Sequence, residues 1–221
     1  MFLLRTAMTQ DLEAQRQQLL ESLRKSGIYD ERVLAAMASI PRELFVDKAH
    51  RSFAYVDRAL PINMGQSISQ PFMVAFMTQA LELSGKERVL EVGTGSGYQA
   101  AILTRLAAYV YSVERHQQLA YVAAQHLLQL GLNNISLYVG DGSLGWPDAA
   151  PYDRIVVTAA APFVPQHLVA QLVVGGILVI PVGSQERQQL LAVHKTSFEP
   201  QITLLGNCVF VPLVGEEGWH E

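Results

Sequence analysis

Short hydrophobic runs alternate with longer segments of helical periodicity from residue 89 onward. The runs are residues 89–92, 110–113, 135–139, 155–157 and 177–180. None of them has a polar face, which is typical of strands buried inside a parallel sheet. Between them, residues 98–108 and 116–130 have the pattern of helices, and Gly131 ends the second. This alternation predicts an α/β fold with a doubly wound, mostly parallel sheet.

The pattern changes at both ends of the chain. Residues 190–194 and 209–213 are predicted strands with no helix-length segment between them, so we expect an antiparallel C-terminal edge of the same sheet. Near the N-terminus, leucines from Leu12 to Leu23 share one helical face, and Asp30 is placed to cap a second helix. We therefore predict one domain over residues 1–221, with a helical extension and loop at about 9–80 and an α/β core at about 85–221.

Composition narrows the class of protein. The 221 residues are 50% hydrophobic, which is enough for a large core, and the formal net charge is −4. No basic patch is present, so nucleic-acid binding is disfavoured. The single cysteine, Cys208, leaves no disulfide framework or cysteine-rich zinc site, and we expect no metal. Because no signal peptide and no run of roughly 18 apolar residues is found, the protein is expected to be cytoplasmic and away from membranes.

A glycine loop follows the first predicted strand of the core. Gly93, Gly95 and Gly97 let the backbone turn tightly and approach a ligand, and the next helix presents its N–H groups there. The spacing is G-x-G-x-G, whereas dinucleotide sites use G-x-G-x-x-G. Glu91 would repel a pyrophosphate but suits the positive charges of S-adenosylmethionine. The loop therefore favours the methyl donor, although such turns also occur without a ligand.

Two further carboxylates lie where predicted strands end. Glu114 can accept hydrogen bonds from both ribose hydroxyls of a nucleoside. Asp141 can bind an adenine amino group, with Gly142 leaving room for the ring. Alone, Glu114 is an ordinary surface carboxylate and Asp141 an ordinary turn residue. Together with the glycine loop, at the carboxyl ends of strands, they predict a nucleoside site.

Several longer motifs resemble the protein-L-isoaspartate O-methyltransferase family, over roughly residues 12–219. They are IPRELFV at 40–46, YVDR at 55–58, LP at 60–61, GQSISQP at 65–71, VLEVGTGSGYQAA at 89–101, GDG at 140–142, YDRIVVTAAAP at 152–162, GGILVIPVG at 175–183 and FVPLVGEEGW at 210–219. The chain is identified on these motifs as a bacterial-type member. Val214 stands where some members have threonine, so a hydroxyl contact from this motif is in doubt. Residues 1–7 match nothing, and Met8 is a second candidate start.

The resemblance implies an activity and a set of site residues. S-adenosylmethionine would donate a methyl group to the free carboxylate of isoaspartyl residues in damaged proteins and peptides, which starts their repair. Ser69 would lie at the active site, while Gln66, Ser67 and Ile68 would line the pocket for donor and acceptor. The donor would be held by Glu91, Gly93, Gly95, Gly97, Glu114, Asp141 and Gly142. No partner subunit is implied, so a monomer is the default.

Other interpretations of the same residues stay open. Ser69 precedes Pro71 and a hydrophobic run, so it is equally a candidate helix cap. An NAD-dependent oxidoreductase is opposed by the glycine spacing and by Glu91. A catalytically silent donor-binding protein is opposed by the intact Ser69 segment. A methyltransferase of a small metabolite is the remaining alternative.

Overall fold

The computed structural model describes the backbone of residues 2–220 and the side chains of residues 11–220. In it, a seven-stranded sheet has the order β5-β4-β3-β6-β7-β8-β9. Its strands are β3 (Arg88–Val92), β4 (Tyr109–Glu114), β5 (Ile135–Val139), β6 (Tyr152–Val157), β7 (Leu172–Gly183), β8 (Gln188–His194) and β9 (Gln201–Cys208). The first five are parallel, whereas β8 and β9 join antiparallel. The predicted doubly wound sheet with an antiparallel C-terminal edge is confirmed.

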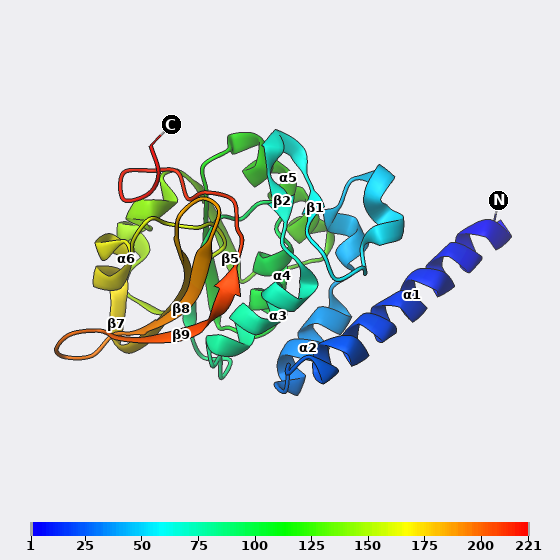
Figure 1. Ribbon diagram of the computed structural model, residues 1–221. Coiled ribbons are helices and arrows are strands. Elements are labelled where there is room, and N and C mark those ends of the chain that lie inside the picture. The colour runs from blue at the N-terminus through cyan, green and yellow to red at the C-terminus, as the bar shows by residue number, and fades with distance from the viewer. Residues whose placement is uncertain (1, 221) are drawn as a thin grey trace.

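Helices and short turns surround this sheet (Figure 1). The helices are α1 (Phe2–Lys25), α2 (Glu31–Ser39), α3 (Pro71–Ala80), α4 (Tyr98–Thr104), α5 (Gln117–Gln129) and α6 (Gln166–Gln171). The 3-10 turns are η1 (Arg42–Phe45), η2 (Lys48–Phe53), η3 (Asn63–Gly65), η4 (Gly142–Leu144) and η5 (Pro147–Ala149), and β1 (Leu60–Pro61) pairs with β2 (Ser67–Ile68). Among the described residues, no helix is long and apolar enough to cross a membrane.

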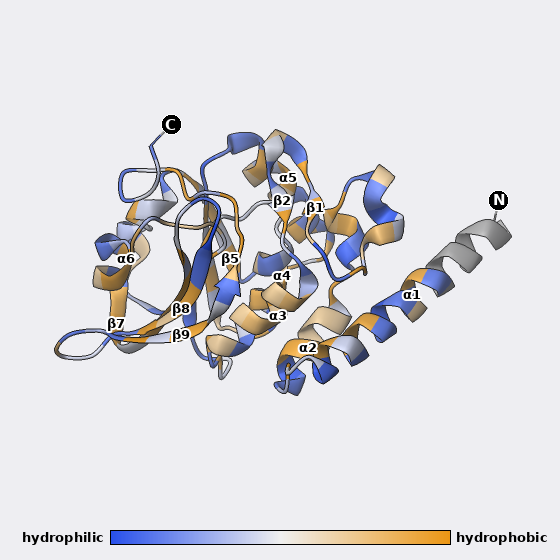
Figure 2. Cartoon of the chain, in the orientation of Figure 1, coloured by the Kyte–Doolittle hydropathy of each residue, from blue (hydrophilic) through white to orange (hydrophobic). Residues whose placement is uncertain are grey.

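Hydrophobic packing joins the N-terminal helices to the core. Leu23 of α1 and Leu34 of α2 belong to the same buried cluster as Ile102 of α4. Figure 1 shows α3 and α4 next to α2, and Figure 2 shows that α3 is hydrophobic along most of its length. Asp30 caps α2 as predicted, by accepting a hydrogen bond from the amide of Arg32. The helical extension is therefore packed against the α/β core.

Two expectations about the strands were wrong. The last strand is β9, whereas residues 209–213 lie outside any strand, with an isolated bridge at Pro212. These residues are hydrophobic because they line the cavities described below, and not because they pair in a strand. In addition, β5 is an edge strand, and Tyr138 and Val139 at its end are exposed. The hydrophobic run at residues 135–139 thus predicted a buried strand, whereas β5 lies at the edge of the sheet and pairs only with β4.

Candidate active site

The glycine loop turns directly after β3, beside the end of β6. Gly93 has φ +94°, and a Cβ there would lie 2.4 Å from the hydroxyl oxygen of Thr158. That hydroxyl donates to the carbonyl oxygen of Gly93 at 2.7 Å. Gly97 has φ +92° at the start of α4, and its Cβ would press on Ala123 of α5. Both positions therefore require glycine, for the backbone conformation and for the close approach.

Glu114 holds this loop from the neighbouring strand. Its carboxylate accepts a hydrogen bond from the amide of Gly95 at 2.9 Å and another from the amide of His116 at 2.9 Å. The residue is buried at the end of β4, and it still lines the cavity described next. A carboxylate oxygen can accept more than one hydrogen bond, so each oxygen keeps acceptor capacity. Glu114 is thus oriented by the protein and available to a ligand.

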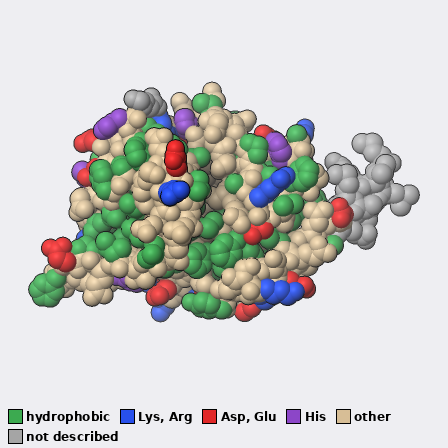
Figure 3. Space-filling view, viewed as in Figure 1, with side chains coloured by type: hydrophobic (Ala, Val, Ile, Leu, Met, Phe, Trp, Pro, Cys, Tyr) green, Lys and Arg blue, Asp and Glu red, His purple; other side chains and the backbone are tan. Residues whose placement is uncertain are grey.

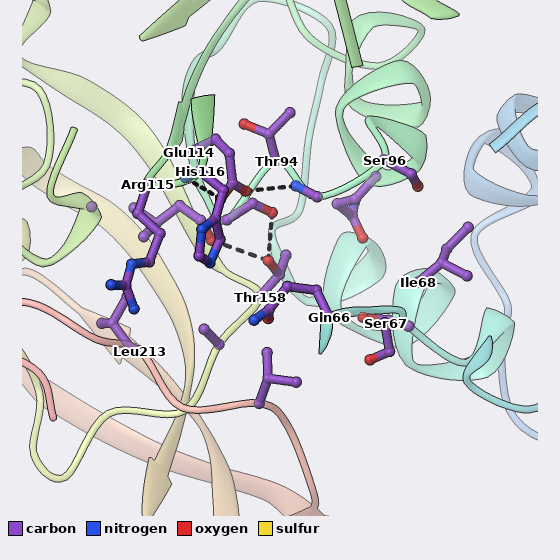
Figure 4. Close-up of a pocket in the computed structure, with 18 of the residues that line it drawn as sticks. Gln66, Ser67, Ile68, Thr94, Ser96, Glu114, Arg115, His116, Thr158 and Leu213 are labelled. Atoms are coloured by element: carbon purple, nitrogen blue, oxygen red, sulfur yellow. Dashed lines mark hydrogen bonds between the residues drawn. The ribbon is translucent and has the colours of Figure 1, made fainter. Parts of the chain in front are cut away.

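A cavity of about 120 Å³ lies at the carboxyl ends of the central strands. Eight residues predicted from the sequence line it: Gln66, Ser67, Ile68, Ser69, Gly93, Gly95, Glu114 and Gly142. In Figure 4, Glu114 and His116 lie on one side and Ser67 and Ile68 on the other. The β1–β2 pair brings residues 66–69 over the end of the sheet. Val214 also lines the cavity, with a hydrocarbon side chain.

Glu91 does not line the cavity. It is fully buried in β3, where one carboxylate oxygen accepts a hydrogen bond from Ser112 and the other has no partner among the described residues. The Ser112 hydroxyl also contacts that of Thr94 in the glycine loop, at 2.6 Å. Burial raises the pKa of Glu91 to about 8, and the nearby charge of Glu114 acts in the same direction. Glu91 therefore lies beneath the glycine loop and outside the cavity lining, so its direct contact with the donor stays a prediction.

Asp141 and Gly97 also lie outside the cavity lining. One oxygen of Asp141 accepts from the amide and the hydroxyl of Ser143, at 2.9 and 2.7 Å. The other oxygen accepts from the amide of Glu216 at 2.7 Å. Asp141 thus ties the end of β5 to the C-terminal segment, which contributes Leu213 and Val214 to the cavity. Gly142 lines the cavity, and the contact between Asp141 and an adenine stays a prediction.

Ser69 lies between this cavity and a second one. Ser67, Ser69, Thr158 and Val211 border both. The second cavity, of about 790 Å³, extends toward Gln188 and Asn207 of the C-terminal strands. Figure 3 shows a hollow near the middle of the molecular face that it draws. Burial raises the pKa of Cys208, which borders the second cavity, to about 11, so its thiol stays protonated.

Ser69 is not the cap of α3. The N-cap residue is Gln70, which makes no side-chain capping bond. The cap comes instead from Asp57, whose carboxylate accepts from the amide of Phe72 at 2.8 Å and from the Gln70 side chain at 3.0 Å. Among the described residues, the carbonyl oxygen of Ser69 accepts a hydrogen bond from Arg42, whereas its hydroxyl has no hydrogen-bond partner. The capping interpretation of Ser69 was therefore wrong, and its hydroxyl is available at the junction of the two cavities.

Several lining residues were missed by the sequence analysis. Thr158 follows β6 directly, so the rule that ligands bind at the carboxyl ends of parallel strands pointed to it. Tyr98 and Gln99 also line the cavity. They begin the helix after the glycine loop, so the position of that loop pointed to them. Leu213 reaches the cavity from the C-terminal segment, and no local pattern indicated this. No group of three or more potential metal ligands occurs within the described residues.

Comparisons with known proteins define the class and then the family. A solved protein-L-isoaspartate O-methyltransferase superposes with a TM-score of 0.83 at 30% identity, over 91% of this chain and 66% of that chain. A Plasmodium falciparum homologue solved with S-adenosyl-L-homocysteine superposes with a TM-score of 0.78 at 24% identity, over 90% of this chain and 98% of that one. The fold is that of the class I S-adenosylmethionine-dependent methyltransferases.

The family is narrower than this class. The model of the family described as "Protein-L-isoaspartate(D-aspartate) O-methyltransferase (PCMT)" matches residues 14–218. Protein-L-isoaspartate O-methyltransferase 2 of Pelobacter propionicus is 56% identical over 90% of this chain and 89% of its own. The corresponding protein of Methanoculleus marisnigri is 52% identical over 93% of this chain and 94% of its own. The chain belongs to the protein-L-isoaspartate O-methyltransferase family.

Proposed function

We propose that this chain transfers a methyl group from S-adenosylmethionine to the free α-carboxylate of isoaspartyl residues in proteins and peptides. Family membership supports the reaction. One observation carries the placement of the site: Ser69 borders both the cavity beside the glycine loop and the larger neighbouring cavity. The donor would occupy the first and a polypeptide acceptor the second, so that the methyl group passes across their junction.

The residues of the first cavity suit a donor of this kind. When bound, S-adenosylmethionine supplies a methyl group on a positively charged sulfur. Glu114 would accept hydrogen bonds from its ribose hydroxyls, because each of its oxygens keeps acceptor capacity beside the amides of Gly95 and His116. Gly93 and Gly142 would let backbone lie close to the ligand, while residues 66–68 cover the cavity from the opposite side. In this proposal Glu91, Gly97 and Asp141 shape the site from outside the cavity.

The acceptor needs no general base. A carboxylate with an ordinary pKa of about 3–4 is ionised at neutral pH and is already a nucleophile. Its oxygen forms a bond to the methyl carbon while the carbon–sulfur bond breaks and the electron pair stays on sulfur. The protein contributes alignment at roughly 3 Å and hydrogen-bond donors that replace lost water. We assign Ser69 as the side-chain donor. The ester product would close to a succinimide with loss of methanol, so repeated cycles restore aspartate.

A pair of peptides tests the proposal. The two peptides share one sequence and differ only in aspartate versus isoaspartate at one position. We expect methyl incorporation into the isoaspartyl peptide and almost none into its twin, because the extra backbone methylene moves the carboxylate by more than 1 Å, a displacement that costs about 100-fold in rate. Equal rates would leave a general carboxyl methyltransferase, and methylation of neither would reject both.

Donor choice has its own measurement. S-adenosylhomocysteine should raise the melting temperature, since a ligand at 100 times its dissociation constant adds about 2.7 kcal/mol of stability. Nicotinamide dinucleotide should not raise it, and the reverse result would favour an oxidoreductase. The cytoplasm is the proposed compartment, because the single cysteine leaves no disulfide framework. A monomer is the default proposal for the oligomeric state.

A further inference from the structure

Arg42 is a charged side chain that the proposed reaction leaves without a role. It opens η1, within the IPRELFV motif at residues 40–46, and is completely buried. It takes part in none of the ion pairs found among the described residues. Burial lowers the pKa of its guanidinium, because desolvation disfavours the charged form. A charge is retained in such a place only where its polar contacts offset the desolvation.

Arg42 makes two hydrogen bonds to backbone carbonyl groups. One of them reaches residues 66–69, which we call the acceptor segment. Its Nε donates to the carbonyl oxygen of Ala54 at 2.8 Å, and its Nη2 donates to the carbonyl oxygen of Ser69 at 2.8 Å. The rigid guanidinium thus fixes the backbone of the residue whose hydroxyl lies at the junction of the cavities. In Figure 1, the light-blue turns that follow α2 lie beside β1 and β2.

The same turn also contacts the donor side. The Cζ atom of Arg42 lies 4.8 Å from the centre of the Tyr98 ring, and Tyr98 lines the first cavity. Phe45, at the other end of η1, packs edge-on against Tyr98 at 5.4 Å and against His126 at 5.1 Å between ring centres. His126 in turn contacts the carbonyl oxygen of Ser96, in the glycine loop, through Nδ1 at 2.9 Å.

We propose that η1 sets the distance between the acceptor segment and the glycine loop, and that Arg42 is the positioning residue for Ser69. This inference rests on the proposed function. In-line methyl transfer tolerates little displacement, because about 1 Å of misplacement costs about 100-fold in rate. The buried guanidinium of Arg42 contacts the Ser69 carbonyl on one side and the Tyr98 ring on the other. It therefore fixes the position of the acceptor segment relative to the donor cavity. Arg42 itself touches neither substrate.

Three variants test this role. Arg42→Met keeps most of the side-chain length but removes the charge and both hydrogen bonds. Arg42→Lys keeps the charge but lacks the fork that reaches two carbonyl groups. The matched control is Arg154→Met, because Arg154 donates to the carbonyl of Leu81, at the opposite end of α3 from Ser69. For each variant, kcat, the KM for an isoaspartyl peptide, the dissociation constant of S-adenosylhomocysteine and the melting temperature are measured.

We expect Arg42→Met to lower kcat by about 10- to 100-fold, with the dissociation constant of S-adenosylhomocysteine changed by less than about threefold. Arg42→Lys should recover part of the rate. Arg154→Met should lower the melting temperature but leave kcat within about twofold. Because Arg42 acts through Ser69, the double variant Arg42→Met/Ser69→Ala should be no more than about threefold slower than Ser69→Ala alone. A purely structural role would not produce this non-additivity.

Three results would overturn the inference. They are a kcat of Arg42→Met within twofold of the wild type, an equal loss of kcat in Arg154→Met, or rate losses that multiply in the double variant. If Arg42→Met does not fold, Arg42→Lys and its Ser69→Ala double carry the same comparisons, and a wild-type rate in Arg42→Lys rejects the role. Failure of the proposed function is distinct, because it appears in the wild type as no transfer to the isoaspartyl peptide.

Discussion

The carboxylate of Glu114 accepts a hydrogen bond from the amide of Gly95 at 2.9 Å, which joins the end of β4 to the loop after β3. Its second oxygen accepts from the amide of His116, so the side chain is fixed before any ligand arrives. A ligand that binds Glu114 therefore pays little to order it. The same contact means that Glu114 supports the glycine loop as well as the donor.

Replacing Glu114 by Ala should weaken binding of S-adenosylhomocysteine by about 1.5–3 kcal/mol, the range for hydrogen bonds to a charged group. Isothermal titration calorimetry measures this directly. Glu199→Ala is the control, because Glu199 is an exposed carboxylate in the β8–β9 connection. Equal affinities for the wild type and the Glu114 variant would place the donor elsewhere.

Replacing Ser69 by Ala should lower the methyl transfer rate by about 2–4 kcal/mol in activation free energy, as for loss of one fixed donor to a developing charge. The melting temperature should stay near that of the wild type, because Ser69 does not cap α3. Steady-state kinetics and a thermal melt separate the two quantities. Kinetics should be sequential, since the acceptor attacks the methyl group directly. A methylated or acylated Ser69 in the mass spectrum would contradict direct transfer.

Replacing Asp57 by Ala should reduce the free energy of unfolding by about 0.5–2 kcal/mol, because Asp57 caps α3 through the amide of Phe72. The rate should fall as well, since the capped amide, that of Phe72, lies three residues after Ser69. Urea denaturation gives the stability, and Asp47→Ala serves as the control, because Asp47 precedes η2 without a side-chain capping bond. A loss of stability no larger than that of the control would remove the capping role.

Glu91 predicts a pH dependence of stability. Its pKa is about 8 in the folded protein against an ordinary value of 4.5, so the folded state binds the proton more tightly. The associated stability is fully present below about pH 4.5 and is lost as the pH rises through about 8. Glu91→Gln mimics the protonated form and should gain stability over the wild type, by up to several kcal/mol, at pH 9 but not at pH 4.

Urea denaturation of the wild type and Glu91→Gln at the two pH values measures this difference. Other titrating groups cancel in the comparison, because they are common to both proteins. Glu199→Gln is the control, since it makes the same chemical change at an exposed position. A Glu91→Gln difference that does not change with pH would show that the pKa of Glu91 is the same in the folded and unfolded states.

Much of the site was predictable because its signals are local. Gly93 and Gly95 follow a strand and adopt positive φ, and Glu114 ends the next strand, so three cavity residues could be found from strand ends alone. The same reasoning predicts a donor contact for Glu91, which is buried in β3 and outside the cavity lining, so that contact stays a prediction. The sequence reasoning also took residues 209–213 for a strand, since hydrophobicity there reports cavity lining.

The sequence by itself determined the parallel sheet, its antiparallel edge, the glycine loop and the family, because periodicity, glycine spacing and motifs are properties of neighbouring residues. Only the tertiary structure decided how the site is held together. Arg42 and Ser69 are 27 positions apart, and Asp57 and Phe72 are 15 apart. Helical or strand periodicity does not link residues that far apart in the sequence. They meet because packing of the helical extension on the sheet brings their segments together. The local sequence pattern predicts secondary structure and does not predict such contacts.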